Sequence, residues 1–232
     1  MSHGEGASAV DLDEVFPWGR SFEEYSAMFA LSDADLDRRI LGCGDGPSSF
    51  NCELTQRGGE VVSFDPIYEA SEKDLHARID ATFDNLMAQV RENRDRFVWR
   101  NLRDVEDLGR VRNEAMHAFL ADFERGKRQG RYLAEELPET PFADDSFDLA
   151  LCSHFLFHYG EHLSLDFHRA AVEEMCRVAR EVRIFPLHEL SGVPSKHVPD
   201  LCDEFEARGH EVEIREVDYE LHRGSNRLLI LR

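Results

Sequence analysis

The stretch Gly42-Cys43-Gly44-Asp45-Gly46 is the part of the sequence from which the fold can be worked out. Three glycines in five positions let the backbone turn sharply and let a ligand approach it closely, because no Cβ intervenes. The short segment 38–41, which ends in Ile40 and Leu41, comes directly before these glycines. We therefore predict a strand over residues 38–41 that ends in a nucleotide-binding type of turn.

A helix and a second strand follow this turn. Residues 48–57 begin with serines that can cap a helix, and Gly58-Gly59 then turns the chain into a strand over residues 60–64. Strand, glycine turn, helix and strand make a βαβ unit. The second strand ends at Asp65, where a carboxylate can accept hydrogen bonds from both hydroxyls of a ribose. An acidic residue before Pro66 can also simply start a turn.

The rest of the chain continues the alternation of helices and strands. We expect helices over residues 21–29, 164–179 and 198–208, a long helical segment over residues 71–127, and strands over residues 131–133, 147–153, 181–185, 211–219 and 227–231. The long segment exceeds an ordinary crossover helix, so we interpret residues 71–130 as a helical insertion over the sheet edge. We expect one domain over residues 1–232, with an N-terminal lid or edge helix within residues 1–37 and a β-hairpin at the end.

Composition narrows the class of protein. The chain has 232 residues, 47 acidic against 27 basic residues and a net charge of -20, which disfavours a general nucleic-acid binder and an anionic membrane surface. The polar N-terminus and the lack of a long apolar run predict a cytoplasmic protein that does not enter a membrane. The five cysteines are widely spread and form no CxxC pair, so we expect neither disulfides nor a zinc module.

A second motif makes the glycine turn specific. The segment Leu137-Pro138-Glu139-Thr140-Pro141-Phe142-Ala143-Asp144-Asp145-Ser146-Phe147-Asp148-Leu149 leads into an apolar strand. It resembles a signature of class I S-adenosylmethionine-dependent methyltransferases, and GCGDG resembles their first motif. The resemblance implies a Rossmann-like, seven-stranded, mostly parallel sheet with an antiparallel terminal strand, and S-adenosylmethionine as cofactor. The segments PWGRSFEEY, GRYLAEELPETPF, SHFLFHY and REVRIFPL resemble an uncharacterised bacterial and archaeal methyltransferase-like subgroup.

The resemblance also implies which residues hold the cofactor. They are Gly42, Cys43, Gly44, Gly46, Asp65, Pro66 and Ser153, with Glu135 near the adenine. The family often has an acid where this chain has Ile40, and Asp45 or Asp148 would have to replace that acid. Arg20 can pair with the methionine carboxylate, although Trp18-Gly19-Arg20 can also belong to an ordinary packed N-terminal segment.

Candidate catalytic residues follow the strand 147–153. His154 is the candidate base and Tyr159 a second candidate, with Phe157 and His158 as candidate walls of the acceptor site. His154, His158 and His162 recur every four residues, but Gly160 interrupts any helix there, so we expect no metal site. We predict a methyltransferase for a small-molecule acceptor. The alternatives are a noncatalytic cofactor-binding or sensing module and an NAD-dependent oxidoreductase, which Pro47 disfavours.

Overall fold

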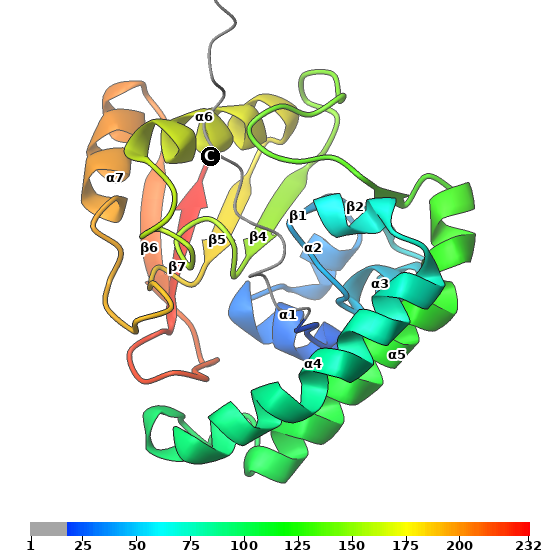
Figure 1. Cartoon of the computed structure of the whole chain (residues 1–232). Coiled ribbons are helices and arrows are strands. Elements are labelled where there is room, and N and C mark those ends of the chain that lie inside the picture. Colours follow the sequence, from blue (N-terminus) through cyan, green and yellow to red (C-terminus); the bar gives the residue numbers. More distant parts are fainter. Residues whose placement is uncertain (1–17) are drawn as a thin grey trace, which may run out of the picture.

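The computed structural model describes residues 18–232, so the part of the expected N-terminal lid that falls on residues 1–17 lies outside the described chain. A seven-stranded sheet with the order β3-β2-β1-β4-β5-β7-β6 forms its centre (Figure 1). The strands are β1 (Arg39–Cys43), β2 (Glu60–Phe64), β3 (Tyr132–Leu133), β4 (Leu149–Ser153), β5 (Val182–Phe185), β6 (Val212–Glu216) and β7 (Arg227–Leu231). β1 to β5 pair in parallel, and β7 runs antiparallel to β5 and to β6. This arrangement confirms the predicted fold class.

Helices cover both faces of the sheet (Figure 1). Alternate residues of β1 and β4 point to opposite faces, so Leu41 and Ala150 belong to one hydrophobic cluster while Ile40 and Leu149 belong to the other. The first cluster includes α6 (Leu165–Val178) and α7 (Val198–Ala207), and the second includes α1 (Phe22–Met28) and α3 (Phe50–Gln56). Burial on both faces explains why the central strands read as continuous apolar runs.

Two long helices occupy the expected insertion. α4 (Glu72–Glu92) follows the short 3-10 helix η1 (Pro66–Glu69), and α5 (Val105–Arg128) follows the 3-10 helix η2 (Arg94–Arg96). The two helices pack side by side (Figure 1). α5 also packs its Phe119 and Phe123 against Tyr132 of β3, so it serves as the crossover helix between β2 and β3. α4 is therefore the additional element, and its C-terminal end lies beyond the carboxyl ends of the strands.

The N-terminal helix is capped and anchored by specific polar contacts. Ser21 and Glu24 form a capping box at the start of α1. The short helix α2 (Asp33–Leu36), which the sequence pattern did not reveal, follows after a tight turn. Arg183 of β5 donates to the Phe29 carbonyl at 2.8 Å and to Asp35 Oδ1 at 3.0 Å, which ties both helices to the sheet. No helix within residues 18–232 is long and apolar enough to cross a bilayer.

The strand order places a crevice at the carboxyl ends of the central strands β1 and β4. From β1 the chain proceeds to β2 on one side, and β4 lies on the other side of β1. Helices that leave neighbouring strands toward opposite faces open a crevice at the carboxyl ends of those strands, where α/β proteins bind ligands. The glycine turn after β1 and the His154 segment after β4 both lie at this crevice.

Candidate active site

The glycine turn adopts the conformation that its sequence requires. Gly44 and Gly46 have φ values of 65° and 54°, which glycine tolerates without strain. The Gly44 N–H donates to the Phe64 carbonyl at 2.9 Å and so continues the β1–β2 pairing. A Cβ atom added at Gly46 would meet nothing within 4 Å, because it would project into open space beside the turn. The turn therefore presents bare backbone to a ligand.

Asp65 is held at the end of β2 by backbone donors. Its Oδ2 accepts from the Gly46 N–H at 2.8 Å, and its Oδ1 accepts from the Ile67 N–H at 3.0 Å. Burial raises the pKa of this carboxyl, while the two backbone hydrogen bonds oppose that shift. Each oxygen keeps a further lone pair, so the fixed carboxylate can still accept hydrogen bonds from two hydroxyls.

The segment Trp18–Arg20 packs directly against the glycine turn. The Arg20 carbonyl accepts from the Ser49 N–H at 3.1 Å and from Ser48 Oγ at 2.9 Å. A Cβ atom at Gly19 would lie 2.0 Å from the Pro47 carbonyl oxygen, so only glycine permits this close approach. The N-terminal segment is therefore fitted to the turn.

Arg20 brings a partly buried positive charge to this place. Its Nη1 donates to the Trp18 carbonyl at 2.8 Å, while its buried Nε has no hydrogen-bond partner among the described residues. Burial, together with the neighbouring Arg112, lowers the pKa of Arg20 to about 10, which still leaves the guanidinium charged at neutral pH. An anionic group of a ligand would complete its hydrogen bonding.

The Asp45 side chain fills the space beside Gly42 at the glycine turn. Its Oδ1 accepts from the Tyr25 hydroxyl at 2.8 Å and its Oδ2 accepts from the Ser63 hydroxyl at 2.6 Å. A Cβ atom at Gly42 would lie 1.8 Å from Asp45 Oδ2, so the glycine leaves room for the carboxylate. Burial raises the pKa of Asp45 to about 6, and the charge of nearby Asp65 adds to the rise.

Of the two acids that could replace the one usual at position 40, Asp45 lies at the crevice and Asp148 does not. Ile40 is fully buried in the hydrophobic core and offers no polar group there. The Asp148 carboxylate accepts from the Arg39 N–H at 3.1 Å, at the opposite ends of β1 and β4. The suggestion that Asp148 replaces the family's acid is therefore wrong.

His154 stands at the end of β4 in an unusual backbone conformation. Its φ is 50°, its N–H donates to the Phe185 carbonyl at 2.7 Å, and its Nδ1 lies 3.0 Å from Ser153 Oγ. Burial, and then the charge of Arg20, holds the pKa of this imidazole well below 6.5. The ring is therefore neutral at pH 7, and the lowered pKa also makes it a weaker base than a free imidazole. Burial raises the pKa of Tyr159 nearby.

Two cavities meet at these side chains. The inner cavity, of about 80 Å³, lies at the glycine turn, and the outer cavity, of about 690 Å³, extends toward the C-terminal end of α4. Trp18, Arg20, His154 and Tyr159 line both. Together they fall within the roughly 300 to 1,000 Å³ of sites for small ligands and cofactors.

The inner cavity gathers most of the residues that the sequence indicated. Its lining includes Arg20, Gly44, Gly46, Asp65, Ser153, His154 and Tyr159. Gly42, Cys43, Pro66 and Glu135 are not among the lining residues of either cavity. The Cys43 side chain lies in the hydrophobic core, and Pro66 begins η1.

Phe157 and His158 were the expected walls of the acceptor site, and the structure places only His158 there. His158 lines the outer cavity, but Phe157 is buried in the core and stacks on His168, so its assignment as a wall is wrong. No group of three potential metal ligands occurs within residues 18–232. Sequence patterns did not indicate Leu75 and Arg78 of α4 in the inner cavity, because only the tertiary fold brings that helix to the turn.

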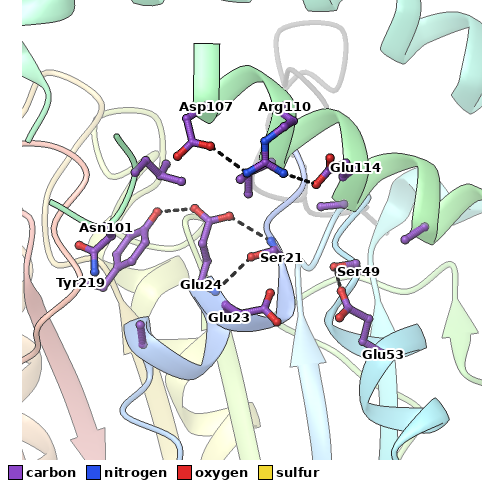
Figure 2. Close-up of a pocket in the computed structure, with 15 residues that line it drawn as sticks. Ser21, Glu23, Glu24, Ser49, Glu53, Asn101, Asp107, Arg110, Glu114 and Tyr219 are labelled. Carbon is purple, nitrogen blue, oxygen red and sulfur yellow. Dashed lines mark hydrogen bonds and ion pairs between the residues drawn. The ribbon is translucent and has the colours of Figure 1, made fainter. Parts of the chain in front are cut away.

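A separate cavity of about 540 Å³ lies between α1, α3 and α5 (Figure 2). Its acids already have partners within the chain. Glu24 accepts from the Tyr219 hydroxyl at 2.6 Å and from the Ser21 N–H at 3.0 Å, and Asp107 accepts from Arg110 at 2.8 Å. This cavity shares no lining residue with the other two. It is not an extension of the site at the glycine turn.

Comparison with known proteins agrees with the motifs and the strand order. Residues 111–182 match the family described as "Methyltransferase domain". The chain is also 30% identical over 224 residues to "Uncharacterized protein MJ0045" from Methanocaldococcus jannaschii, which covers 96% of this chain and 98% of that protein. The chain belongs to the class I S-adenosylmethionine-dependent methyltransferases.

Solved methyltransferases also resemble the chain at low sequence identity. The Burkholderia thailandensis 1,6-didemethyltoxoflavin-N1-methyltransferase, with bound 1,6-didemethyltoxoflavin and S-adenosylhomocysteine, is 12% identical, with a TM-score of 0.49 over 90% of this chain and 76% of that one. Magnesium protoporphyrin IX methyltransferase from Synechocystis, with bound S-adenosylhomocysteine, is 11% identical, with a TM-score of 0.47 over 90% of this chain and 82% of that one.

The geometry of this methyltransferase fits its cofactor, S-adenosylmethionine. The cofactor carries ribose hydroxyls, a carboxylate and an ammonium group. The site offers the fixed carboxylate of Asp65, the partly buried guanidinium of Arg20 with its unpartnered Nε, and the buried carboxylate of Asp45. Each of these three groups of the cofactor thus has a complementary group at the crevice.

Proposed function

We propose that the chain methylates a small-molecule acceptor in the outer cavity while S-adenosylmethionine occupies the glycine turn. One observation carries the proposal. The cavity at the turn adjoins a cavity of about 690 Å³, and His154 and Tyr159 line both. A group that faces two bound molecules at once can position them and can take a proton from one of them.

Individual residues would hold the cofactor at its two ends. Asp65 would accept hydrogen bonds from the ribose hydroxyls, while the backbone at Gly44 and Gly46 approaches the ligand where no Cβ interferes. Arg20 would pair with the methionine carboxylate and Asp45 would attract the ammonium group. Contact between Glu135 and the adenine stays a prediction from the family resemblance.

Methyl transfer requires that the cofactor and the acceptor are aligned and that one proton leaves the acceptor. S-adenosylmethionine supplies a methyl group on a sulfonium: the acceptor's lone pair forms the new bond to the methyl carbon, and the sulfur keeps the electron pair of the broken S–C bond. Correct alignment alone can lower such a barrier by roughly 7 to 11 kcal/mol. The neutral imidazole of His154 would accept the acceptor's proton. Tyr159 would orient the acceptor from the shared wall.

The charge of the molecule supports a small acceptor over a nucleic acid. A net charge of -20 repels a phosphate backbone at long range. The outer cavity, by contrast, has the size of a pocket for a metabolite.

Transfer of a labelled methyl group tests this proposal. The full chain is incubated with S-adenosylmethionine labelled in its methyl group and with a cell extract that is then separated into small molecules, protein and nucleic acid. We expect label in the small-molecule fraction. Label confined to protein or nucleic acid contradicts the proposal. Tight binding of S-adenosylmethionine with no label in any fraction favours the noncatalytic module instead.

A further inference from the structure

The outer cavity has a charge opposite to that of the molecule as a whole. Acidic residues outnumber basic ones by 47 to 27 in the chain. Three arginines nevertheless line this cavity, Arg20, Arg96 and Arg223, and Asp95 is the one acid among its described lining residues. A positive cavity on an acidic protein favours an anionic ligand.

Two of these arginines are held together at the rim. Arg96 ends η2, and Arg223 lies in the connection between β6 and β7. The Arg223 N–H donates to the Arg96 carbonyl at 3.3 Å, and Phe97 and His222 form a β-bridge beside it. Both side chains are exposed, and within residues 18–232 neither has an ion-pair partner. Both arginines thus come from adjacent backbone segments and line the same mouth.

Arg96 and Arg223 carry like charges at the same mouth, so both attract an anionic group that approaches it. The positive charge of the arginines also acts on histidines of the cavity. Burial lowers the pKa of His222 to about 4, and the charges of Arg20, Arg112 and Arg96 add to the fall. Burial and Arg20 similarly lower the pKa of His158 to about 3. A bound anion would relieve this unfavourable concentration of positive charge.

Apolar and aromatic side chains form the walls between the rim and the glycine turn. Trp18, Phe97, Leu86, Val90, Leu190 and Leu221 line the outer cavity. Phe97 lies with its ring centre 4.5 Å from that of His222 and 5.5 Å from that of Trp99, which fixes it in the wall. These walls fit a flat or apolar molecular body.

We infer that the acceptor is a small organic anion with an apolar or aromatic body, whose carboxylate or phosphate group binds Arg96 and Arg223 at the rim. This inference rests on the proposed function and names the substrate class of the same site. An arginine guanidinium can bind a carboxylate or a phosphate through two parallel N–H···O bonds, so the shared chemistry is an anionic oxygen group.

The arrangement also separates the anionic group from the methylated atom. Arg96 and Arg223 line only the outer cavity, whereas His154 and Tyr159 line both cavities. An acceptor with its anion at the rim presents the other end of its body to His154. The group that receives the methyl is therefore a different atom from the anionic oxygen, and the product is not an ester of that carboxylate.

Binding to the full chain in the presence of S-adenosylhomocysteine tests the inference without turnover. Four pools of matched compounds are compared by ligand-observed NMR: aromatic carboxylates, aromatic phosphate monoesters, the corresponding neutral amides and the corresponding amines. The variant Arg96→Ala/Arg223→Ala removes both rim charges. Arg94→Ala serves as the control, because this exposed arginine belongs to the same 3-10 helix and does not line the cavity.

We expect members of one or both anionic pools to bind, and the rim variant to weaken their binding about 10- to 100-fold while Arg94→Ala and the affinity for S-adenosylhomocysteine stay unchanged. Preferential binding of amides or amines, no binding from any pool, or unchanged binding of anions in the rim variant overturns the inference. A product methyl that base releases as methanol also overturns it. Bound anions that receive no methyl group contradict the proposed function and leave this inference standing.

Discussion

Arg20 combines a positive charge with a buried, unpartnered Nε at the crevice, which makes it the residue that we expect to bind the methionine carboxylate. Arg20→Met should weaken binding of S-adenosylmethionine about 10- to 100-fold, the effect of losing a charge-assisted hydrogen bond. Isothermal titration calorimetry measures the change. 5′-Methylthioadenosine lacks the amino-acid end, so its affinity should stay the same. An equal loss for both ligands would instead mean that the variant disturbs the whole site.

Asp45 predicts a pH dependence of cofactor binding. Its pKa of about 6 means that the ionised fraction falls as the pH decreases through 6, while the ammonium group of the cofactor stays protonated. The affinity for S-adenosylmethionine should therefore fall between pH 7 and pH 5. Asp45→Asn should bind more weakly at pH 7 and lose this dependence in calorimetric titrations. Asp148→Asn should keep the wild-type profile, and a pH dependence that survives in Asp45→Asn contradicts the role of Asp45.

A substitution that tests His154 must tolerate the positive φ of that position. Its φ of 50° is tolerated better by asparagine than by alanine, so His154→Asn removes the imidazole with little strain. We expect kcat for the methylated acceptor to fall about 10²- to 10⁴-fold, with the affinity for S-adenosylmethionine unchanged. His162→Asn, at an exposed histidine outside both cavities, is the matched control. Wild-type turnover of His154→Asn would exclude the imidazole as the base.

At the scale of single residues, the sequence predicted the lining of the inner cavity better than that of the outer cavity. Gly44, Gly46, Asp65 and His154 follow strands at the same edge of the sheet, so their place can be deduced from strand ends alone. Arg96 and Arg223 belong to two connections whose meeting depends on the tertiary fold. No local sequence pattern predicts that these two connections lie side by side. The sequence alone therefore could not predict the outer cavity.

At the scale of helices and strands, too, local sequence patterns predict some bounds and tertiary contacts determine others. The strand predicted over residues 60–64 agrees with β2, and the strand predicted over residues 227–231 agrees with β7. The strand predicted over residues 211–219 is too long, because β6 ends at Glu216 and Tyr219 turns inward to donate to Glu24. Alternation of apolar residues fixes where a strand begins, but a long-range hydrogen bond decides where this one ends.

The contact between the N-terminal segment and the glycine turn predicts the effect of Gly19→Ala. The added methyl group would lie 2.0 Å from the Pro47 carbonyl oxygen, which belongs to the backbone and cannot rotate away. The segment must therefore shift and carry Arg20 with it. We expect a loss of about 1–3 kcal/mol in the free energy of unfolding, as for other overpacked sites, and at least tenfold weaker binding of S-adenosylmethionine. Urea denaturation and calorimetry measure the two effects.

Gly109→Ala is the control for this substitution. A Cβ atom there would meet the flexible end of the Met87 side chain, which can move aside, and the position is within α5. Alanine in a helix interior is favoured over glycine by roughly 0.5–1 kcal/mol, so stability should be kept. Cofactor binding by Gly19→Ala at the wild-type level would show that the segment and the turn are not coupled.

At the scale of the whole molecule, one buried network joins three distant parts of the chain. Arg112 of α5 is fully buried and forms an ion pair with Glu24 of α1, and the Tyr219 hydroxyl donates to Glu24 at 2.6 Å. The charge of Arg112 holds the pKa of Glu24 below its usual range despite burial. The network connects the N-terminal segment, the crossover helix and the connection that carries Arg223, which together surround the two cavities.

This network predicts a large loss of stability for Glu24→Gln. The substitution keeps the size of the side chain but leaves the buried guanidinium of Arg112 without a counter-charge, which costs about 3–5 kcal/mol in other buried pairs. Glu23→Gln makes the same change of charge at an exposed neighbour and should alter the free energy of unfolding by less than about 0.5 kcal/mol. Urea denaturation of both variants at pH 7 measures the difference. Equal stability of the two variants would mean that the pair does not hold these parts together.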